Sequence, residues 1–468
     1  MTRTAVVLFT SDLRVRDHPP LRAALAACER VVPLFVRDRR VAEAGFDAPN
    51  RLAFLADCLA DLDAGLRSRG GRLIVRSGDV ADEVGAVVRE TGAREVHLAA
   101  GVSGYAQARE RRLRTAVERL GAELRVHDAV VTVVPPGAVV PSGKGADHFA
   151  VFTPYARRWA QESPRAPLPA PRAVRVPDGV RTEEVPARED VAGVSPGLAR
   201  GGEAEGRRRL TAWLRGPLGA YAARHDDLAG DATSRLSPHL HFGTLSPTEI
   251  VHRAREKSGE GGEGGEGADA FVRQVCWRDF HHQVLAARPE AATEDYRRRD
   301  DTWRADGEEA EAWRRGRTGY PVVDAAMRQL LHEGWTHNRG RLLAASFLTK
   351  TLYVDWRTGA RHYLSLLVDG DVANNQLNWQ WVAGTGTDTR PNRVLNPVRQ
   401  GRRYDPDGTY VRRWVPELAG IQGPSVHEPW KLSARERAAY DYPEPVVALA
   451  DGLARFRRAR GMGVTRSS

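Results

Sequence analysis

The first 130 residues alternate short apolar runs with amphipathic stretches, and this alternation constrains the fold more than any other feature of the chain. The stretch from Arg51 to Arg69 has helical spacing, with an apolar stripe of Leu52, Leu55, Leu59, Leu62 and Leu66. The apolar runs are AVVLF (5–9), VVPLFV (31–36), RLIVR (72–76), EVHLAA (95–100) and ELRVH (123–127). Strands that are apolar throughout and alternate with helices indicate a parallel sheet covered on both faces. Residues 1–130 are therefore predicted to form an α/β domain with a doubly wound parallel sheet.

The rest of the chain has a different character. A chain of 468 residues is too long for one core, so two domains are expected. Residues 131–200 contain the Pro- and Gly-rich stretches VVPPGAVVPSGKG and SPRAPLPAPRAVRVP, which predict an interdomain connector. From 201 to 468 the pattern is helical, and ten of the eleven tryptophans lie there. We expect an all-α C-terminal domain that carries the aromatic chemistry.

Charge and cysteine content restrict the partners and the compartment. With 70 basic and 60 acidic residues the net charge is +10, which favours a polyanionic partner such as nucleic acid. Arginines spread over solvated faces would give the same balance. Cys28, Cys58 and Cys276 show no metal-type pairing and are too few for a disulfide framework, which favours a reducing compartment. The N-terminus has no signal-peptide core, and no run reaches the ~20 apolar residues that span a bilayer, so we expect a cytoplasmic protein.

One glycine-rich run imitates a nucleotide-binding motif. The run GEGGEG at 259–264 matches G-x-G-x-x-G, but a dinucleotide loop must follow a strand and open a helix. This run follows HRAREKS and continues with more Gly and Glu, so it predicts a flexible acidic loop between helices. The N-terminal domain is not expected to bind NAD in the usual way.

Two segments of the helical region combine polar and aromatic side chains. DATSRLSPHL (231–240) places hydroxyls and an arginine ahead of a helix, where backbone N–H groups either bind phosphate oxygens or simply cap the helix. In FVRQVCWRDFHHQV (271–284), Gln274 shares a helical face with Trp277 or Arg278. An indole beside an amide and a guanidinium can stack on a base and bind its edge, or the indole can be a core residue.

The segment DGDVANNQLNWQWVAGTGTD (369–388) is rich in amide, carboxylate and indole groups. Two carboxylates are too few for a hard-cation cage, and no further ligand lies at suitable spacing, so no metal site is predicted. Asp369 is instead expected to pair with Arg341, which lies one turn from Asn338 on a helix that begins near Thr336.

These segments, in their order along the chain, resemble the photolyase/cryptochrome flavoproteins. The resemblance runs from about residue 5 to about residue 445 and is densest from 221 to 430. It rests on VFTPYARRW (151–159), TSRLSPHL (233–240), WRDF (277–280), TGYPVVDAAMRQL (318–330) and NWQW with AGTGTD (378–388). It implies an N-terminal α/β domain, a long connector and a C-terminal helical domain that holds FAD.

The resemblance also implies a cofactor role for particular residues. The pyrophosphate and ribityl part would contact Tyr221, Thr233, Ser234, Leu236 and Ser237. The isoalloxazine and adenine regions would contact Arg278, Arg341, Asp369 and Asp371, with Phe271 packing on the cofactor and Asn375 facing the flavin N5. An amide suits that position because it can donate or accept a hydrogen bond, whereas a carboxylate would disfavour an anionic reduced flavin.

The family repairs cyclobutane pyrimidine dimers in DNA with an electron from light-excited, reduced FAD. The dimer is flipped out of the duplex into a pocket above the flavin, and the cofactor supplies the hard chemistry. Three indoles, Trp379, Trp356 and Trp303, match the family's electron relay, and Trp313 occupies a nearby matching position. The resemblance implies that the lesion and its DNA contact Gln274, Trp277, Asn338, Arg339, Trp381 and Gln400.

Several residues depart from the family's usual pattern. Gln274 stands where dimer photolyases usually carry Glu and where (6-4) photolyases carry Gln. The histidine pair of (6-4) photolyases is replaced by Asn338 and Leu342, which leaves that chemistry without a proton donor. Leu342 also replaces a Met that is usual in dimer photolyases, and His225 replaces a more frequent Arg. Dimer repair remains the preferred hypothesis, with a cryptochrome-type light sensor and a (6-4) photolyase as alternatives.

An antenna chromophore is the remaining cofactor question. In GYAQARER (104–111), Ala108 and Arg109 stand where folate-binding members carry an Asn-Glu pair. A deazaflavin in the N-terminal domain, a folate or no antenna are all open. Damaged DNA is the expected partner, and we expect a monomer that needs no protein partner and no membrane.

Overall fold

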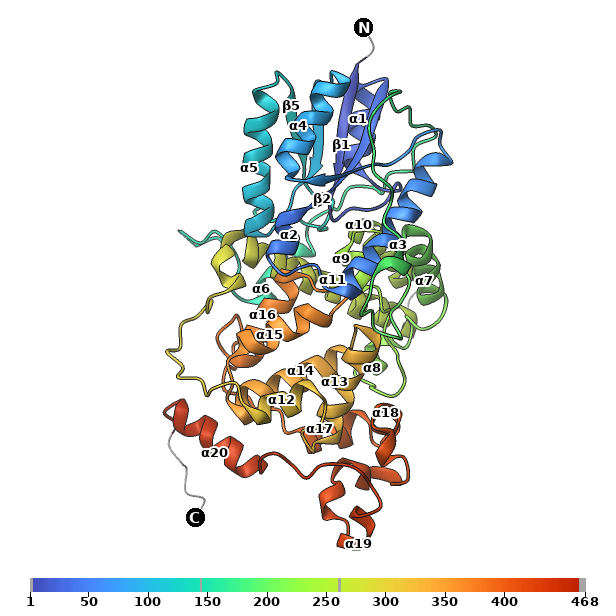
Figure 1. The fold of residues 1–468 in the computed structure, drawn as a ribbon. Coiled ribbons are helices and arrows are strands. Elements are labelled where there is room, and N and C mark those ends of the chain that lie inside the picture. Colours follow the sequence, from blue (N-terminus) through green and yellow to red (C-terminus); the bar gives the residue numbers. More distant parts are fainter. Residues whose placement is uncertain (1–2, 144, 260–261, 463–468) are drawn as a thin grey trace.

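The computed structural model describes residues 3–143, 145–259 and 262–462, which form a sheet domain above a helical domain (Figure 1). The sheet consists of parallel strands in the order β3-β2-β1-β4-β5. Their bounds are β1 Thr4–Phe9, β2 Arg30–Asp38, β3 Ile74–Gly78, β4 Glu95–Ala99 and β5 Glu123–His127. All five predicted runs form strands, and the predicted doubly wound α/β domain is confirmed.

Helices cover both faces of this sheet. Successive strand residues point to opposite faces, so Val7 and Phe9 pack under α1 and α3, while Val6 and Leu8 pack under α4 and α5. The helices of this domain are α1 Pro19–Ala27, α2 Arg39–Glu43, α3 Pro49–Arg67, α4 Val80–Thr91 and α5 Gly104–Glu118. The inner strands β1 and β4 are buried along their whole length, and β2 over most of it, whereas the edge strands β3 and β5 are partly exposed.

Helix α3 differs from its prediction at its first turn. Leu59, Leu62 and Leu66 are buried as expected, but Leu52 is 39% exposed. The buried side of that turn belongs to Asn50 and Arg51, which reach the helical domain. Asn50 Nδ2 donates to the Leu366 carbonyl at 2.6 Å, and Arg51 Nη1 donates to the Leu367 carbonyl at 3.0 Å. Polar contacts between the domains therefore displace the leucine from the predicted stripe.

The chain between β5 and α7 is mostly irregular and contains α6 Phe152–Trp159 and η1 Arg188–Asp190. Helix α6 belongs by its packing to the helical domain, because Phe152, Tyr155 and Trp159 are buried in one core cluster with residues of α11.

The helical domain extends to the C-terminal α20. Its α-helices are α7 Glu203–Arg215, α8 Tyr221–Arg224, α9 Ser237–His241, α10 Pro247–Ser258, α11 Gly262–Ala287, α12 Glu308–Arg314, α13 Pro321–Glu333, α14 Asn338–Ser346, α15 Trp356–Leu366, α16 Val372–Ala383, α17 Pro397–Tyr404, α18 Thr409–Trp414, α19 Ala434–Arg437 and α20 Leu449–Ala459. The short helices are η2 Pro289–Ala292, the π-helix η3 Phe347–Leu352, η4 Pro416–Leu418, η5 Gly423–His427 and η6 Pro429–Lys431. The predicted helical character of this region is confirmed.

The glycine-rich run at 259–264 corrects one prediction. Residues 260–261 lie outside the described ranges, but from Gly262 onward the run belongs to α11 rather than to a loop. The buried residues of α11 further along the chain anchor the helix, and its first turns extend from this packed part. The run follows α10 and not a strand, as expected for a chance match to the dinucleotide motif.

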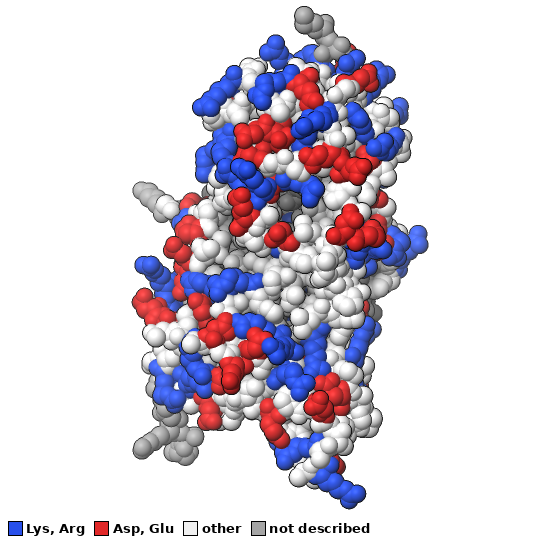
Figure 2. Space-filling model, viewed as in Figure 1, with Lys and Arg blue, Asp and Glu red and all other residues white. Residues whose placement is uncertain are grey.

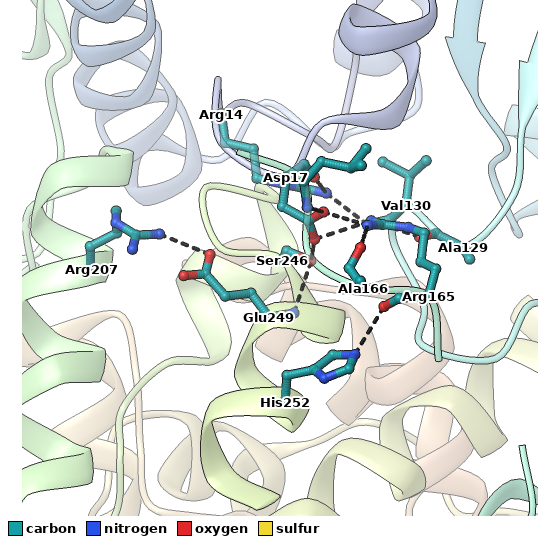
Figure 3. Close-up of polar contacts among 11 residues, drawn as sticks. Arg14, Asp17, Ala129, Val130, Arg165, Ala166, Arg207, Ser246, Glu249 and His252 are labelled. Atoms are coloured by element: carbon teal, nitrogen blue, oxygen red, sulfur yellow. Dashed lines mark hydrogen bonds and ion pairs between the residues drawn. The ribbon is translucent and has the colours of Figure 1, made fainter. Parts of the chain in front are cut away.

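A network of buried charges joins the two domains (Figure 3). Asp17, whose side chain is fully buried, accepts hydrogen bonds from Arg165, Ser246 and the Leu168 N–H at 2.8 Å. Arg14, also buried, donates to the Gly243 carbonyl at 2.9 Å. Burial would raise the pKa of Asp17, but these donors outweigh it and lower the pKa. The junction is therefore a polar contact in which the chain itself supplies partners to the buried carboxylate.

The surface charge is mixed. On the face seen in Figure 2, basic and acidic side chains are interspersed over both domains, and a largely uncharged band lies between them. No helix in the described ranges combines the length and apolar character that crossing a bilayer requires. Among the same residues, no group of three or more His, Cys, Asp or Glu side chains is placed to hold a metal ion. The three cysteines are free and buried.

Candidate cofactor and lesion site

Within the segment 369–383, the side chain of Asp371 caps the N-terminus of a helix. Asp371 precedes α16, and its Oδ1 accepts a hydrogen bond from the Asn374 N–H at 2.7 Å. An acidic N-cap satisfies an otherwise free N–H and opposes the positive end of the helix dipole. Its Oδ2 lies 3.0 Å from Nε2 of His282. Burial would raise the pKa of Asp371, but His282 and Arg278 hold the pKa well below its usual range.

The ion pair predicted from the sequence is present. Arg341 Nη2 donates to Oδ2 of Asp369 at 2.8 Å, with the carboxylate side chain 3% exposed. A second bond, from Nε to the Thr336 carbonyl at 2.9 Å, fixes the guanidinium. The other carboxylate oxygen of Asp369 is buried without a hydrogen-bond partner. A buried carboxylate oxygen without a partner is costly, so this atom marks a place where a polar ligand fits.

Arg278 lies on α11 and faces the same region. Its Nη2 donates to the Leu240 carbonyl at 3.2 Å, and Asp371 is among the charges that act on it. Burial lowers the pKa of the Arg278 guanidinium, and Asp371 and Asp279 oppose the shift. Arginines from α11 and α14 and aspartates from the turn before α16 therefore come together in this region. They are Arg278, Arg341, Asp369 and Asp371.

Asn375 uses its amide nitrogen within the protein and leaves its side-chain oxygen for a ligand. Its Nδ2 donates to the Ala360 carbonyl at 3.1 Å and to Oε1 of Gln376 at 2.8 Å. Both protons of the amide nitrogen are used, so the carbonyl oxygen is the end left to meet a ligand. This buried residue is held by α15 and α16 and can accept a hydrogen bond from a ring N–H.

The segment 221–237 supplies hydroxyls to the site. Thr233 Oγ1 is buried and has no hydrogen-bond partner, whereas Ser237 Oγ accepts from Trp335 Nε1 at 3.2 Å. Ser234 Oγ caps the backbone N–H of Leu236 at 3.4 Å. These residues precede or begin α9, a helix of only five residues.

Two aromatic residues pack beside this segment. Tyr221 and Phe271 meet edge to face, with ring centroids 5.9 Å apart. Both are buried, and Trp213 contacts both rings. The predicted role of Phe271 against the cofactor stays a prediction.

The tryptophans of the predicted relay lie in or beside one core cluster. Trp379 and Trp356 are buried and Trp303 is half-buried. A Cβ placed on Gly359 would lie 2.2 Å from the Trp379 ring, so Trp379 lies directly against α15, one turn from Trp356. Trp313 is also a neighbour of Trp379, with ring centroids 6.0 Å apart. Trp379, Trp356 and Trp313 therefore lie on α16, α15 and α12, whereas Trp303 lies in the segment before α12. The electron-transfer role of Trp379, Trp356 and Trp303 stays a prediction.

None of the six predicted lesion-binding residues is buried, whereas five of the predicted cofactor residues are, namely Tyr221, Leu236, Phe271, Asp369 and Asn375. Trp277 stacks on Phe152, with centroids 3.6 Å apart and planes 5° apart, so α6 supports one face of its indole. Trp381 and Gln400 are half-buried, and Gln274 and Asn338 are exposed. Partial exposure suits side chains that meet DNA from outside.

Arg339 is already engaged by the chain. It donates to both oxygens of Asp226, at 3.2 and 2.7 Å, and its guanidinium lies 4.4 Å from the Tyr404 ring centroid. A phosphate contact by Arg339 would have to share the guanidinium with this carboxylate.

Sequence reasoning missed three residues of the site. His281 Nδ1 lies 3.1 Å from Asn374 Oδ1, and His282 holds Asp371. Burial lowers the pKa of His281 to about 4, so it is neutral. The HH pair one turn after Arg278 was the available signal. Arg51 comes from the other domain, and the sequence offers no signal for this contact.

Comparison with known proteins identifies the family of the chain. Residues 5–172 match the family model of DNA photolyase, and residues 271–460 match the model of the FAD binding domain of DNA photolyase. A deoxyribodipyrimidine photo-lyase of Streptomyces griseus is 69% identical over 458 residues, which is 98% of this chain and 99% of the relative. The chain belongs to the photolyase/cryptochrome family.

Solved photolyase and cryptochrome structures share the whole fold. A bacterial class III photolyase from Agrobacterium tumefaciens superimposes with a TM-score of 0.91 at 32% identity, over 98% of each chain. A Synechocystis cryptochrome gives a TM-score of 0.91 at 30% identity, over 98% of this chain and 99% of that chain. As a photolyase-family protein, the chain uses FAD as the cofactor of its helical domain.

The residues present fit FAD on structural grounds as well. Thr233 Oγ1 and Asp369 Oδ1 lack partners and belong to the set that the resemblance assigns to the cofactor. His281 Nε2 and His282 Nδ1 are further buried atoms without partners beside Asp371. A large ligand with hydroxyl, phosphate and amide groups would satisfy such atoms.

Proposed function

We propose that this chain is a light-driven DNA repair enzyme with deoxyribodipyrimidine photo-lyase activity, which splits cyclobutane pyrimidine dimers. The observation that carries the proposal is the Arg341–Asp369 pair with its free carboxylate oxygen, within a helical domain of the family's FAD-binding type. Reduced FAD, when bound, supplies the electron that splits the dimer after absorbing light.

The chain's own residues hold the cofactor from several directions. We propose that Thr233, Ser234 and Ser237, with Tyr221 and Leu236, enclose the pyrophosphate and ribityl part. Arg278, Arg341, Asp369 and Asp371 would hold the ring systems, with Phe271 packed against the cofactor. The free carbonyl oxygen of Asn375 would accept a hydrogen bond at the flavin N5, since both its amide protons are already used.

The lesion would enter from the more exposed side. Trp277 is supported from behind by Phe152 and can offer its other face to a flipped base. Trp381 would contact the second base, with Gln274, Asn338, Arg339 and Gln400 around the opening. Arginines at the rim would bind phosphates without reading sequence.

The tryptophans would restore the reduced cofactor. We propose that electrons pass inward from Trp303 through Trp356 to Trp379, with Trp313 as a neighbour of the inner indole. Repair by cofactor that is already reduced needs none of these steps.

The test is to illuminate chemically reduced, FAD-loaded protein with dimer-containing oligothymidylate and to follow the return of thymine absorbance. We expect recovery in blue light and none in the dark. DNA that carries (6-4) lesions should remain unchanged, because Asn338 and Leu342 offer no proton donor. Dimers that persist in the light, with tight DNA binding intact, would favour a light sensor instead.

We further propose that the chain acts on damaged DNA as a monomer in the cytoplasm. Three free, buried cysteines fit a reducing compartment. Sedimentation of the FAD-loaded protein with and without DNA is expected to give one chain per complex, and a concentration-dependent dimer would contradict this.

A further inference from the structure

The loop that follows α8 carries a carboxylate that holds one of the proposed DNA-contacting arginines. Asp226 Oδ1 accepts a hydrogen bond from Arg339 Nε at 3.2 Å, and Oδ2 accepts one from Nη2 at 2.7 Å. The side chains of Arg339 and Asp226 are 15% and 28% exposed. The pair is therefore bidentate and lies at the border with solvent, where a phosphate offers the guanidinium the same two-point contact.

Tyr404 of α17 holds both the arginine and the loop. The Arg339 guanidinium lies 4.4 Å from the Tyr404 ring centroid, and that of Arg403 lies 5.1 Å from it. The Tyr404 carbonyl accepts a hydrogen bond from the N–H of Leu228, a buried residue two positions beyond Asp226, at 3.0 Å. The loop is thus attached to α17 independently of the ion pair. Only the ion pair has to open when Arg339 turns to a phosphate.

A histidine lies beside the same carboxylate. His225 Nδ1 lies 3.1 Å from both the Tyr221 and the Ala222 carbonyl oxygens, so this nitrogen carries a proton and donates it. His225 Nε2 lies 3.9 Å from Asp226 Oδ2, the oxygen that Arg339 Nη2 binds. A neutral imidazole turns a lone pair towards this carboxylate. The contact becomes favourable when Nε2 takes up a proton.

Other titratable groups around the pair keep their charge near neutral pH. Burial lowers the pKa of His337, which precedes α14, to about 4. Burial and Asp226 raise the pKa of Tyr221 to about 12. Burial would raise the pKa of Asp227, but Arg224 and neighbouring N–H groups outweigh it and lower the pKa. Imidazole is the side chain that ordinarily changes charge between pH 5 and 8, which leaves the histidine beside Asp226 as the pH-dependent neighbour.

This histidine is also one of the chain's departures from the usual pattern of the family. An arginine is more frequent at position 225, and a permanent cation there would attract Asp226 at every pH. With His225 the attraction depends on protonation. The departure therefore makes the Asp226–Arg339 pair sensitive to pH.

We propose that Asp226 holds Arg339 while no DNA is bound and moves to protonated His225 when a phosphate takes Arg339. This inference rests on the proposed function, because it requires the phosphate contact of Arg339. Each cation keeps one anion: the phosphate pairs with Arg339, and Asp226 pairs with an imidazolium that has taken one proton from the solvent. DNA binding is therefore coupled to proton uptake at His225, and the affinity for DNA rises as the pH falls.

The first experiment measures how the affinity of FAD-loaded protein for a dimer-containing duplex depends on pH, in the dark and at constant salt. From pH 8 to pH 6 the wild-type affinity should rise up to about 5-fold, which corresponds to one exposed ion pair. His225→Gln keeps an N–H donor but cannot take up the proton, and His225→Arg is a permanent cation. Both variants should lose this rise, while equal flavin absorbance shows that the cofactor site is intact. A rise of the same size in His225→Gln would overturn the inference.

The second experiment removes the charge that competes with the phosphate. Asp226→Asn should bind the duplex about 10-fold more tightly at pH 8, because Arg339 no longer has to leave a carboxylate. In protein that already carries Arg339→Ala, the same substitution should have no such effect. A residue that only supports the loop predicts the opposite result, so weaker or unchanged binding by Asp226→Asn would contradict the proposal.

The neighbouring carboxylate provides a matched control. The Asp227 side chain is 33% exposed, close to the value for Asp226, but it pairs with Arg224 at 2.9 Å. Asp227→Asn removes the same charge and should change the affinity less than about 2-fold, as expected for a screened surface charge. A gain as large as that of Asp226→Asn would show that any lost negative charge strengthens binding.

The salt dependence separates failure of this inference from failure of the proposed function. Arg339→Ala should reduce the slope of log affinity against log salt by about 0.9, the value for one phosphate contact. An unchanged slope removes the phosphate contact and the inference with it. A reduced slope with a pH-independent wild-type affinity overturns the inference and keeps the proposed function. A wild type that does not bind dimer-containing DNA removes both.

Discussion

The domain junction and the cofactor site both bury charge, but they satisfy it differently. At the junction, Asp17 is held by Arg165, Ser246 and a backbone N–H of the same chain. At the cofactor site, Asp369 has one oxygen bound to Arg341 and the other without a partner. Both carboxylates are almost fully buried.

For these two carboxylates, the difference separates one that the chain itself completes from one that a ligand can complete. Leaving a buried carboxylate oxygen without a partner costs free energy, which a bound polar group would recover. Replacement at the junction should therefore change stability without changing cofactor binding. Replacement at the site should mainly change cofactor binding.

The largest effect is expected at the junction. Asp17→Ala leaves the guanidinium of Arg165 without its carboxylate, so the free energy of unfolding should fall by about 3–5 kcal/mol. Urea unfolding measures this change. The fraction that stays folded should still bind FAD with wild-type affinity, and a loss of affinity would show that the two regions are not independent.

The next effect is expected at the site. Arg341→Ala removes the only hydrogen bond that the Asp369 carboxylate makes within the described residues, so FAD affinity should fall about 100-fold. Flavin titration of the FAD-free protein measures it. Arg339→Ala, two positions earlier on the same helix, is the matched control, since Arg339 pairs with Asp226 and should affect DNA binding instead.

A smaller effect is expected in how the free energy of unfolding depends on pH through His281. The folded pKa of His281 is about 4, below the 6.5 of an unfolded histidine. Between these values only the unfolded state binds the proton, so stability falls as pH falls, by about 1.4 kcal/mol for each pH unit. His281→Gln should remove about 2 kcal/mol of the stability lost between pH 7 and pH 5. Denaturation curves at both pH values test this, and an unchanged difference between them would contradict a buried, neutral His281.

The smallest effect on stability is expected at the relay. Trp303→Phe keeps an aromatic ring at a half-buried position, so the free energy of unfolding should change by less than about 1 kcal/mol. Photoreduction of FAD should nevertheless slow strongly, while repair by chemically reduced protein continues. Normal photoreduction would remove Trp303 from the relay.

The sequence predicted the sheet domain well, because its inner strands are largely apolar and its helices keep a clear period. It also predicted the Arg341–Asp369 pair, since Arg341 lies on a helix and Asp369 stands out as a charge just before the amide-rich helix α16. It wrongly predicted that Leu52 is buried, because contacts between the domains place Asn50 and Arg51 on the buried side of the first turn of α3. It also took Gly262–Gly264 for a loop, because packing further along α11 overrides low helix propensity.

Other contacts left no periodic signal in the sequence. Arg51 reaches the helical domain across more than three hundred residues of chain, and Phe152 supports Trp277 from a segment that looked like connector. The unpartnered atoms of Thr233 and Asp369 become visible only when every neighbour is placed.

One paired measurement tests the contrast most directly: apoprotein stability and FAD affinity in Thr233→Val and Ser246→Ala. Thr233 Oγ1 has no partner, so its removal should leave the apoprotein as stable as before and weaken FAD binding by about 0.5–1.5 kcal/mol. Ser246 Oγ binds Asp17, so its removal should lower apoprotein stability by about 1–3 kcal/mol and leave FAD affinity unchanged. A destabilised Thr233→Val apoprotein that binds FAD normally would contradict the account.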